Sequence, residues 1–115
     1  MSSLDQARDI ALGLPEAVEV DHHGIASFRV RGKIFATVPD DRHIRIMLDE
    51  NGIRSAVAEF PAVCDEFYWG TKLSCVVVTV TDATTGLLRE LLEDAYRRKA
   101  PASLVRRIDQ VEREH

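Results

Sequence analysis

The amino-acid sequence predicts an α+β fold with two layers, in which an antiparallel β-sheet carries helices packed on one of its faces. Apolar residues recur at helical spacing near both ends of the chain, and several short segments between them alternate apolar and polar residues. Short, turn-like connections between those segments favour antiparallel pairing over parallel crossovers. With 115 residues the chain has the length of one domain, which we expect to span residues 1–115.

A first helix is predicted over residues 3–13. Ser3 and Gln6 have the spacing of a capping box, in which each side chain bonds a free backbone N–H group at the start of the helix. Apolar residues follow every three or four positions, and Pro15 ends the helix. A short strand containing Val18 and Val20 then leads into the sheet.

The clearest strands form a hairpin around Gly32, because apolar and polar residues alternate on both sides of this glycine. A tight turn over residues 31–33 would place Val30 opposite Ile34. It would also place Phe28 opposite Ala36, so that one face of the hairpin is apolar. The other face then receives the side chains of Arg29, Arg31, Lys33 and Phe35.

The next segments continue the sheet and begin its cover. A strand with Ile44 and Ile46 on the apolar face leaves Arg45 on the opposite face. Asp49 is a suitable N-cap for a second helix, which Pro61 ends.

A second hairpin and two helices complete the chain. The hairpin strands are predicted over residues 64–68 and 73–80, and the β-branched run from Val76 to Val78 suits a central strand. The longest helix begins at Asp82 or Thr84, and a last helix follows Pro101.

Composition narrows the class of protein. No apolar run approaches the ~20 residues that a membrane span needs, and no basic stretch leads into an apolar one as in a secretory signal. We therefore expect a cytoplasmic protein. The formal net charge of −4 argues against an ordinary basic nucleic-acid-binding domain. Two segments are nevertheless basic: residues 27–47 carry five bases and two acids, and residues 97–107 carry five bases and no acid.

The predicted polar face of the sheet is the first candidate binding surface. Residues two apart on a strand share a face, and neighbouring strands extend the same patch. Arginine and lysine side chains there could contact phosphates, while an exposed aromatic ring could stack on a base. This candidate surface consists of Arg29, Arg31, Lys33, Phe35 and Arg45. The alternative is an ordinary solvated face whose Phe35 is buried by a helix.

The turn of the second hairpin is another candidate. Trp69 and Lys72 flank a glycine there, and a tryptophan at such a position could form an exposed recognition tip. The alternative is a packed aromatic side chain, since tryptophan is highly buried on average.

Catalytic and metal sites find little support in the sequence. Two adjacent histidines, His22 and His23, point to opposite faces of a strand unless the chain bends, so they suit one metal ion poorly even with His43. Cys64 and Cys75 would lie opposite each other if the hairpin loop were Trp69-Gly70, but they are small enough to be ordinary core residues. We predict no catalytic residues, no metal site and no cofactor.

Several of these segments together resemble the MmcQ/YjbR family, over about residues 11–102. The similarity lies in Leu14-Pro15-Glu16-Ala17, Glu19, His23-Gly24, Ser27-Phe28-Arg29-Val30, Gly32-Lys33-Ile34-Phe35-Ala36-Thr37, Leu88-Arg89-Glu90-Leu91-Leu92, Ala95-Tyr96 and Ala100-Pro101. The resemblance implies a YjbR-like α+β fold, similar in architecture to the CyaY-like fold, and a DNA-binding protein without established catalytic residues. One position departs from the family pattern: members often carry a tryptophan where this chain has Cys75.

Two hypotheses about function follow. The first is a non-enzymatic protein that binds DNA weakly and in a salt-dependent manner, through Arg29, Arg31, Lys33, Arg45, Phe35, Trp69 and Lys72. The second is a protein- or small-ligand-binding module that uses the aromatic surface around Trp69 and no nucleic acid. Binding that survives high salt would favour the second hypothesis, because apolar burial does not depend on the release of counterions.

Overall fold

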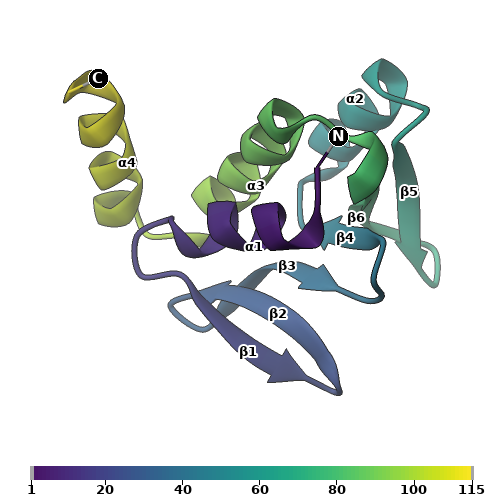
Figure 1. Cartoon of the computed structure of the whole chain (residues 1–115), viewed down its shortest axis with the longest axis horizontal. Coiled ribbons are helices and arrows are strands. Elements are labelled where there is room, and N and C mark those ends of the chain that lie inside the picture. The colour runs from purple at the N-terminus through teal and green to yellow at the C-terminus, as the bar shows by residue number, and fades with distance from the viewer. Residues whose placement is uncertain (1, 115) are drawn as a thin grey trace.

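The computed structural model of the chain describes residues 2–114, and side chains as far as Gln110 (Figure 1). Within these residues, four α-helices and six β-strands follow the predicted order. In chain order the elements are α1 (Leu4–Leu12), β1 (Val18–His22), β2 (Ile25–Val30), β3 (Lys33–Val38), β4 (His43–Ile46), α2 (Glu50–Glu59), β5 (Cys64–Trp69), β6 (Lys72–Thr79), α3 (Thr85–Lys99) and α4 (Ala102–Glu114).

The strands form one antiparallel sheet in the spatial order β1-β2-β3-β4-β6-β5. Helix α3 packs on β3 and β4, α1 packs on α3, and α2 packs on β5 and β6. These helices cover one face of the sheet (Figure 1), so the predicted two-layer α+β fold is confirmed. We call the other side the open face.

Predicted capping residues start three of the helices. Ser3 and Gln6 form both halves of a capping box at α1. The Asp49 side chain accepts a hydrogen bond of 2.7 Å from the backbone N–H of Gly52 at α2. Thr84, rather than Asp82, caps α3, because residues Val80–Asp82 form a separate turn of 3₁₀-helix.

The first two hairpins turn in two residues each. In the β2–β3 loop Arg31 and Gly32 have φ angles of 51° and 79°, and in the β1–β2 loop His23 and Gly24 have 53° and 89°. Positive φ at both positions is the pattern of a type I′ turn, whose twist matches that of paired strands. The β2–β3 turn is therefore shorter than predicted, and Val30 lies opposite Lys33 instead of Ile34.

Strand β3 restores the expected pairing through a bulge. Phe28 lies opposite Ala36 as predicted, but the next residue of β2, Arg29, lies opposite Ile34. Phe35 is the additional residue between these two pairs. Its fully buried ring packs edge-on against Tyr96 of α3, with the ring centroids 5.7 Å apart. The prediction that Phe35 lies on the open face is therefore wrong, because it assumed strict alternation along β3.

A second bulge lies in β6. Phe67 of β5 is opposite Cys75 and Tyr68 is opposite Leu73, so Ser74 is the additional residue. Bulges bend a strand and increase its twist. The two bulges lie on either side of β4, in β3 and in β6. They provide a physical reason for the curvature of the sheet around its open face.

The covered face holds the apolar core. Ile44, Ile46, Val76 and Val78 on the central strands are fully buried. The Tyr96 hydroxyl donates a 2.7 Å hydrogen bond to the carbonyl oxygen of Pro15, which ties α3 to the segment between α1 and β1. Within residues 2–114, no helix is both long enough and apolar enough to cross a membrane.

The inward position of Phe35 can be tested by truncation. We expect Phe35→Ala to lower the free energy of unfolding by about 3–5 kcal/mol, because it leaves a cavity against Tyr96. Trp69→Ala is the control, since its ring is exposed and its loss should change stability by less than about 0.5 kcal/mol. Urea denaturation of both variants measures the difference. Equal stability of the two would contradict the inward position of Phe35.

Candidate functional site

A hollow of about 650 Å³ occupies the open face of the sheet. All six strands contribute to its wall, together with the segment after β4 and the end of α3. Its side chains include His22, Ile25, Ile34, Thr37, Arg45, Met47, Phe67, Trp69, Lys72, Leu73, Cys75, Arg98 and Lys99. Because both outer hairpins reach the same space, the open face is concave.

Thr37 lies at the centre of this concave face. It is opposite Ser27 of β2 and Arg45 of β4, so the three side chains form a row across the sheet. Only 5% of Thr37 is exposed. Its Oγ1 atom is buried and has no hydrogen-bond partner among the described residues. A buried hydroxyl without a partner costs free energy, so a bound group that bonded this oxygen would recover that cost.

Aromatic and planar groups line the wall nearest β5. The Arg45 guanidinium lies over the ring of Phe67, 4.5 Å from its centroid. Trp69 follows at the end of the same strand and is 76% exposed, the largest value among the exposed large hydrophobic residues. An exposed tryptophan beside a hollow provides a surface on which another planar group can stack.

The three lysines of the chain gather at one end of the sheet. Lys33 begins β3 and Lys72 begins β6. Because both strands are antiparallel to β4, which lies between them, these two strand starts lie at the same end of the sheet as the end of β4. Lys99 reaches this edge from the last residue of α3. Burial lowers the pKa of Lys99, and the nearby charges of Arg98, Lys33 and Lys72 lower it further. We refer to Lys33, Lys72 and Lys99 as the lysine rim.

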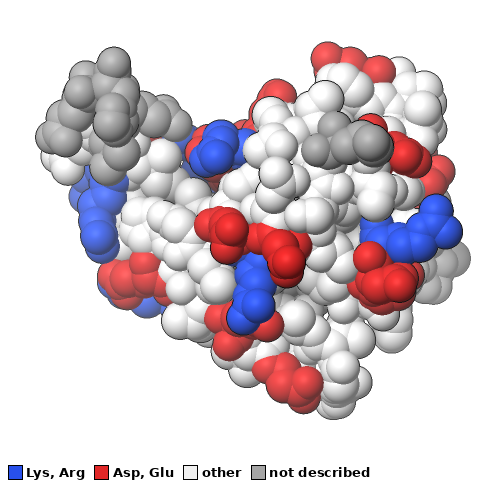
Figure 2. All heavy atoms as spheres, viewed as in Figure 1, with Lys and Arg blue, Asp and Glu red and all other residues white. Residues whose placement is uncertain are grey.

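The charge of the hollow is positive although the protein is acidic overall. Arg45, Lys72, Arg98 and Lys99 line it, against the carboxylates of Asp49 and Glu50. The Asp49 carboxylate caps α2, and an Arg98 guanidinium nitrogen donates to the backbone carbonyl of Met47 at 2.9 Å. On the face that α1 crosses, by contrast, acidic and basic side chains are interspersed (Figure 2). The cations of the hollow therefore form a local patch.

The predicted binding residues divide between three places. Arg45, Trp69 and Lys72 line the hollow, and Lys33 lies beside them in the lysine rim. Phe35 is in the core. The remaining two residues, Arg29 and Arg31, engage other side chains.

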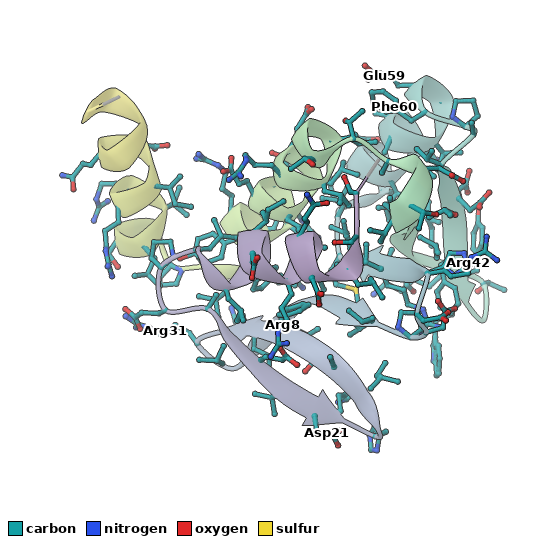
Figure 3. The ribbon with its side chains drawn as sticks, viewed as in Figure 1. Arg8, Asp21, Arg31, Arg42, Glu59 and Phe60 are labelled. Atoms are coloured by element: carbon teal, nitrogen blue, oxygen red, sulfur yellow. The ribbon has the colours of Figure 1, made fainter. Side chains whose placement is uncertain are left out.

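Arg29 and Arg31 are held by local partners. Arg29 donates from Nε to Ser27 Oγ at 3.1 Å, and its terminal nitrogen lies 3.3 Å from His22 Nδ1. Arg31 forms a two-bond ion pair with Glu16, at 2.7 and 2.9 Å. This pair lowers the pKa of the Glu16 carboxyl through hydrogen bonding and charge. Figure 3 shows Arg31 pointing away from the sheet on the side of α4.

The bases of the second basic segment, residues 97–107, are also divided between the hollow and local ion pairs. Arg98 and Lys99 line the hollow, whereas Arg97 pairs with Asp109 at 3.1 Å and Arg107 lies 3.8 Å from Glu16. Segment charge alone therefore overstated the number of bases that share one surface.

Sequence reasoning missed the interior of the hollow. Thr37, Met47 and Phe67 lie on strands and turns that the sequence marks correctly, but the two bulges decide which way neighbouring side chains point. The positions of Lys33 and Lys72 at strand starts and of Lys99 at a helix end are visible in the sequence. They become informative only when the strand order is known.

The cysteines lie on opposite sides of the sheet. Cys64 is opposite Val78 on the covered face, and Cys75 is opposite Phe67 and lines the hollow. They are not opposite each other, because the loop is Gly70-Thr71 rather than Trp69-Gly70. Burial raises the pKa of each thiol to about 11. Such thiols are poor nucleophiles at neutral pH.

His22 lies beside Arg29, whereas His43 lies beside Asp40. The Nδ1 atom of His43 lies 2.9 Å from an oxygen of Asp40, in a turn that also holds the carboxylate with two backbone N–H groups. These bonds lower the pKa of Asp40. Over the described part of the chain, no three His, Cys, Asp or Glu side chains are grouped as metal ligands.

Comparisons with known proteins identify relatives of the fold. The family model described as YjbR matches residues 12–98. The crystal structure of the Deinococcus radiodurans protein DR2400, which carries a DUF419 domain, superposes with a TM-score of 0.67. The aligned sequences are 20% identical, and the alignment covers 84% of this chain and 77% of that chain. No curated protein sequence matches this chain significantly.

Thiol reactivity tests the surroundings of both cysteines. At about pH 8 we expect Ellman's reagent to label the folded protein at least about 100 times more slowly than the protein in urea, because raised pKa values leave few thiolates. The rate should increase with pH as the thiols ionise. Rapid labelling of a cysteine in the folded protein would instead indicate an activated nucleophile.

Proposed function

The chain belongs to the YjbR family, and we propose that it is a non-enzymatic DNA-binding protein that contacts nucleic acid through the hollow and its lysine rim. The observation that carries the proposal is the gathering of all three lysines, with Arg98, beside an exposed tryptophan on a concave face. Lysines bind phosphate groups as point charges, and aromatic rings stack on bases.

The proposed surface differs from the one that alternation along the strands indicates. It keeps Arg45, Trp69, Lys72 and Lys33 and adds Arg98 and Lys99 at the end of α3. Arg31 contributes less because Glu16 already neutralises its charge. Binding through about five cations should be weak and should depend strongly on salt.

The overall charge of −4 does not oppose this proposal at short range. Charges separated by more than about 8–10 Å are screened at physiological salt, so the local cations determine the contact with a phosphate backbone. The acidic remainder should slow long-range association at low salt. It should also discourage non-specific binding elsewhere on the protein.

A second function has one observation in its favour. Trp69 is exposed at the end of β5 and lines the hollow, and its chain neighbour Tyr68 is also exposed. A protein or an uncharged small molecule could bury these rings without any nucleic acid. Such binding would persist at high salt, which separates it from the first proposal.

The lysine rim gives the sharpest test of DNA binding. Fluorescence anisotropy of labelled duplex and single-stranded DNA should show affinity that falls about 10²–10³-fold between about 50 and 200 mM salt. We expect the triple variant Lys33→Gln, Lys72→Gln, Lys99→Gln to bind at least about tenfold more weakly at low salt. For duplex DNA, the slope of log affinity against log salt concentration should become shallower by up to about three. Each lost phosphate contact reduces the magnitude of this slope by about 0.9.

A matched variant controls for the change of net charge. Arg42→Gln, Arg89→Gln and Arg106→Gln remove three exposed arginines that do not line the hollow. This variant should keep the affinity and salt slope of the unmodified protein. Equal losses in the two triple variants would mean that total charge, rather than the lysine rim, governs binding. Absence of binding by the unmodified protein at low salt would refute the proposal.

A further inference from the structure

The shape of the hollow discriminates between forms of nucleic acid. A paired duplex presents its phosphates on the outside and keeps its bases in the stack, with only their edges visible in the grooves. It can lie across the lysine rim but cannot fill a concave space. The hollow measures about 650 Å³, within the range of about 300–1,000 Å³ that is usual for small-ligand sites. It is therefore suited to a group the size of one unpaired base with its sugar.

The wall chemistry favours a planar, partly apolar group. Ile34, Met47 and Phe67 supply apolar surface, and the Arg45 guanidinium lies over the Phe67 ring as a cation–π pair. Trp69 stands at the edge with most of its surface free. Bases stack on such side chains because every base has a π-face.

Thr37, a residue in the wall of the hollow, carries a buried hydroxyl group. The Thr37 hydroxyl can donate one hydrogen bond and accept others, and none of the described residues bonds it. The edge of a base carries both donors and acceptors. A ligand made only of hydrocarbon would leave this buried hydroxyl without a partner.

The rim supplies the complement of a phosphate. Lys72 and Lys99 line the hollow and Lys33 lies close enough to influence Lys99. A phosphate placed between them would neutralise cations that otherwise repel one another. Burial lowers the pKa of Lys99, and the neighbouring charges of Arg98, Lys33 and Lys72 lower it further.

We infer that the hollow binds one nucleoside phosphate, either as a free nucleotide or as an unpaired position in a nucleic-acid strand. The strand form rests on the proposed DNA binding, whereas the free form does not. In both forms the base contacts Thr37 and the aromatic wall, and the phosphate contacts the lysine rim.

The single tryptophan of the chain reports directly on this site. Titration with deoxyadenosine monophosphate or thymidine monophosphate should change Trp69 fluorescence in a saturable manner, and calorimetry should give the same affinity. Deoxyadenosine and inorganic phosphate, tested alone, should each bind at least about tenfold more weakly, because each makes only half of the contacts. Absence of binding by both nucleotides at millimolar concentration would overturn the free form.

Thr37→Val separates binding from folding. Valine has a similar shape and no hydroxyl, so the variant should be at least as stable as the original protein. It should bind the nucleotide about 5–10-fold more weakly, as expected for one lost hydrogen bond. Thr79→Val on β6 makes the same chemical change outside the wall of the hollow and should leave the affinity unchanged. Unchanged affinity in Thr37→Val would contradict the assigned position of the base.

Oligonucleotides distinguish the two sources of the ligand and separate this inference from the proposed function. A duplex with one unpaired bulged nucleotide should bind more tightly than the fully paired duplex, and Thr37→Val should remove that advantage. Equal, salt-dependent binding of both duplexes, insensitive to Thr37→Val, would support DNA binding and overturn the strand form. Binding of mononucleotides without binding of any oligonucleotide would refute DNA binding and identify a free nucleotide as the ligand.

Discussion

The additional residue in β3 determines which side chains belong to the core and which to the hollow. Phe35 occupies that position and packs against Tyr96, which is itself tied to Pro15 by a hydrogen bond. Because Phe35 turns inward, Ile34 lies opposite Arg29 and becomes part of the concave wall. In the other half of the sheet, the bulge at Ser74 of β6 likewise shifts which residues of β5 and β6 lie opposite each other. The core contact of one aromatic ring and the shape of the hollow are thus consequences of the same irregularity in the strand.

The fold also concentrates charge that the sequence disperses. Lys33, Lys72 and Lys99 are far apart in the chain, yet the order β3-β4-β6 and the length of α3 bring them to one edge. Such crowding destabilises the unbound protein slightly, because like charges repel and Lys99 is partly desolvated. An anion between these side chains would reverse both effects. A protein of net charge −4 can in this way present a local cluster of cations.

The sequence predicted most of the elements, because their signals are local. Ser3, Asp49 and Thr84 act as caps through side chains that bond backbone groups three residues away, and Gly32 permits the positive φ of its turn. The position of Phe35 could not be predicted, because the alternation of apolar and polar residues does not reveal a bulge. An aromatic residue is compatible with either face of the sheet. The hollow itself depends on the pairing of distant strands and on their curvature. Of the seven residues predicted to bind DNA, Arg45, Trp69 and Lys72 line the hollow.

Thr37 is the position where local rules and the observed sequence disagree. A buried residue in the centre of a sheet is normally apolar, or polar with its hydrogen bonds satisfied. Ser27, the residue of β2 opposite Thr37, has its hydrogen bonds satisfied. Its hydroxyl donates to the carbonyl oxygen of Val20 and accepts from Arg29. Thr37 follows neither rule within the described protein, although valine would fill the same space. Exceptions of this kind concentrate at sites where stability is given up for binding. The unpartnered hydroxyl is therefore more informative than the aromatic or basic residues around it, because charge and exposed rings occur on many surfaces without function.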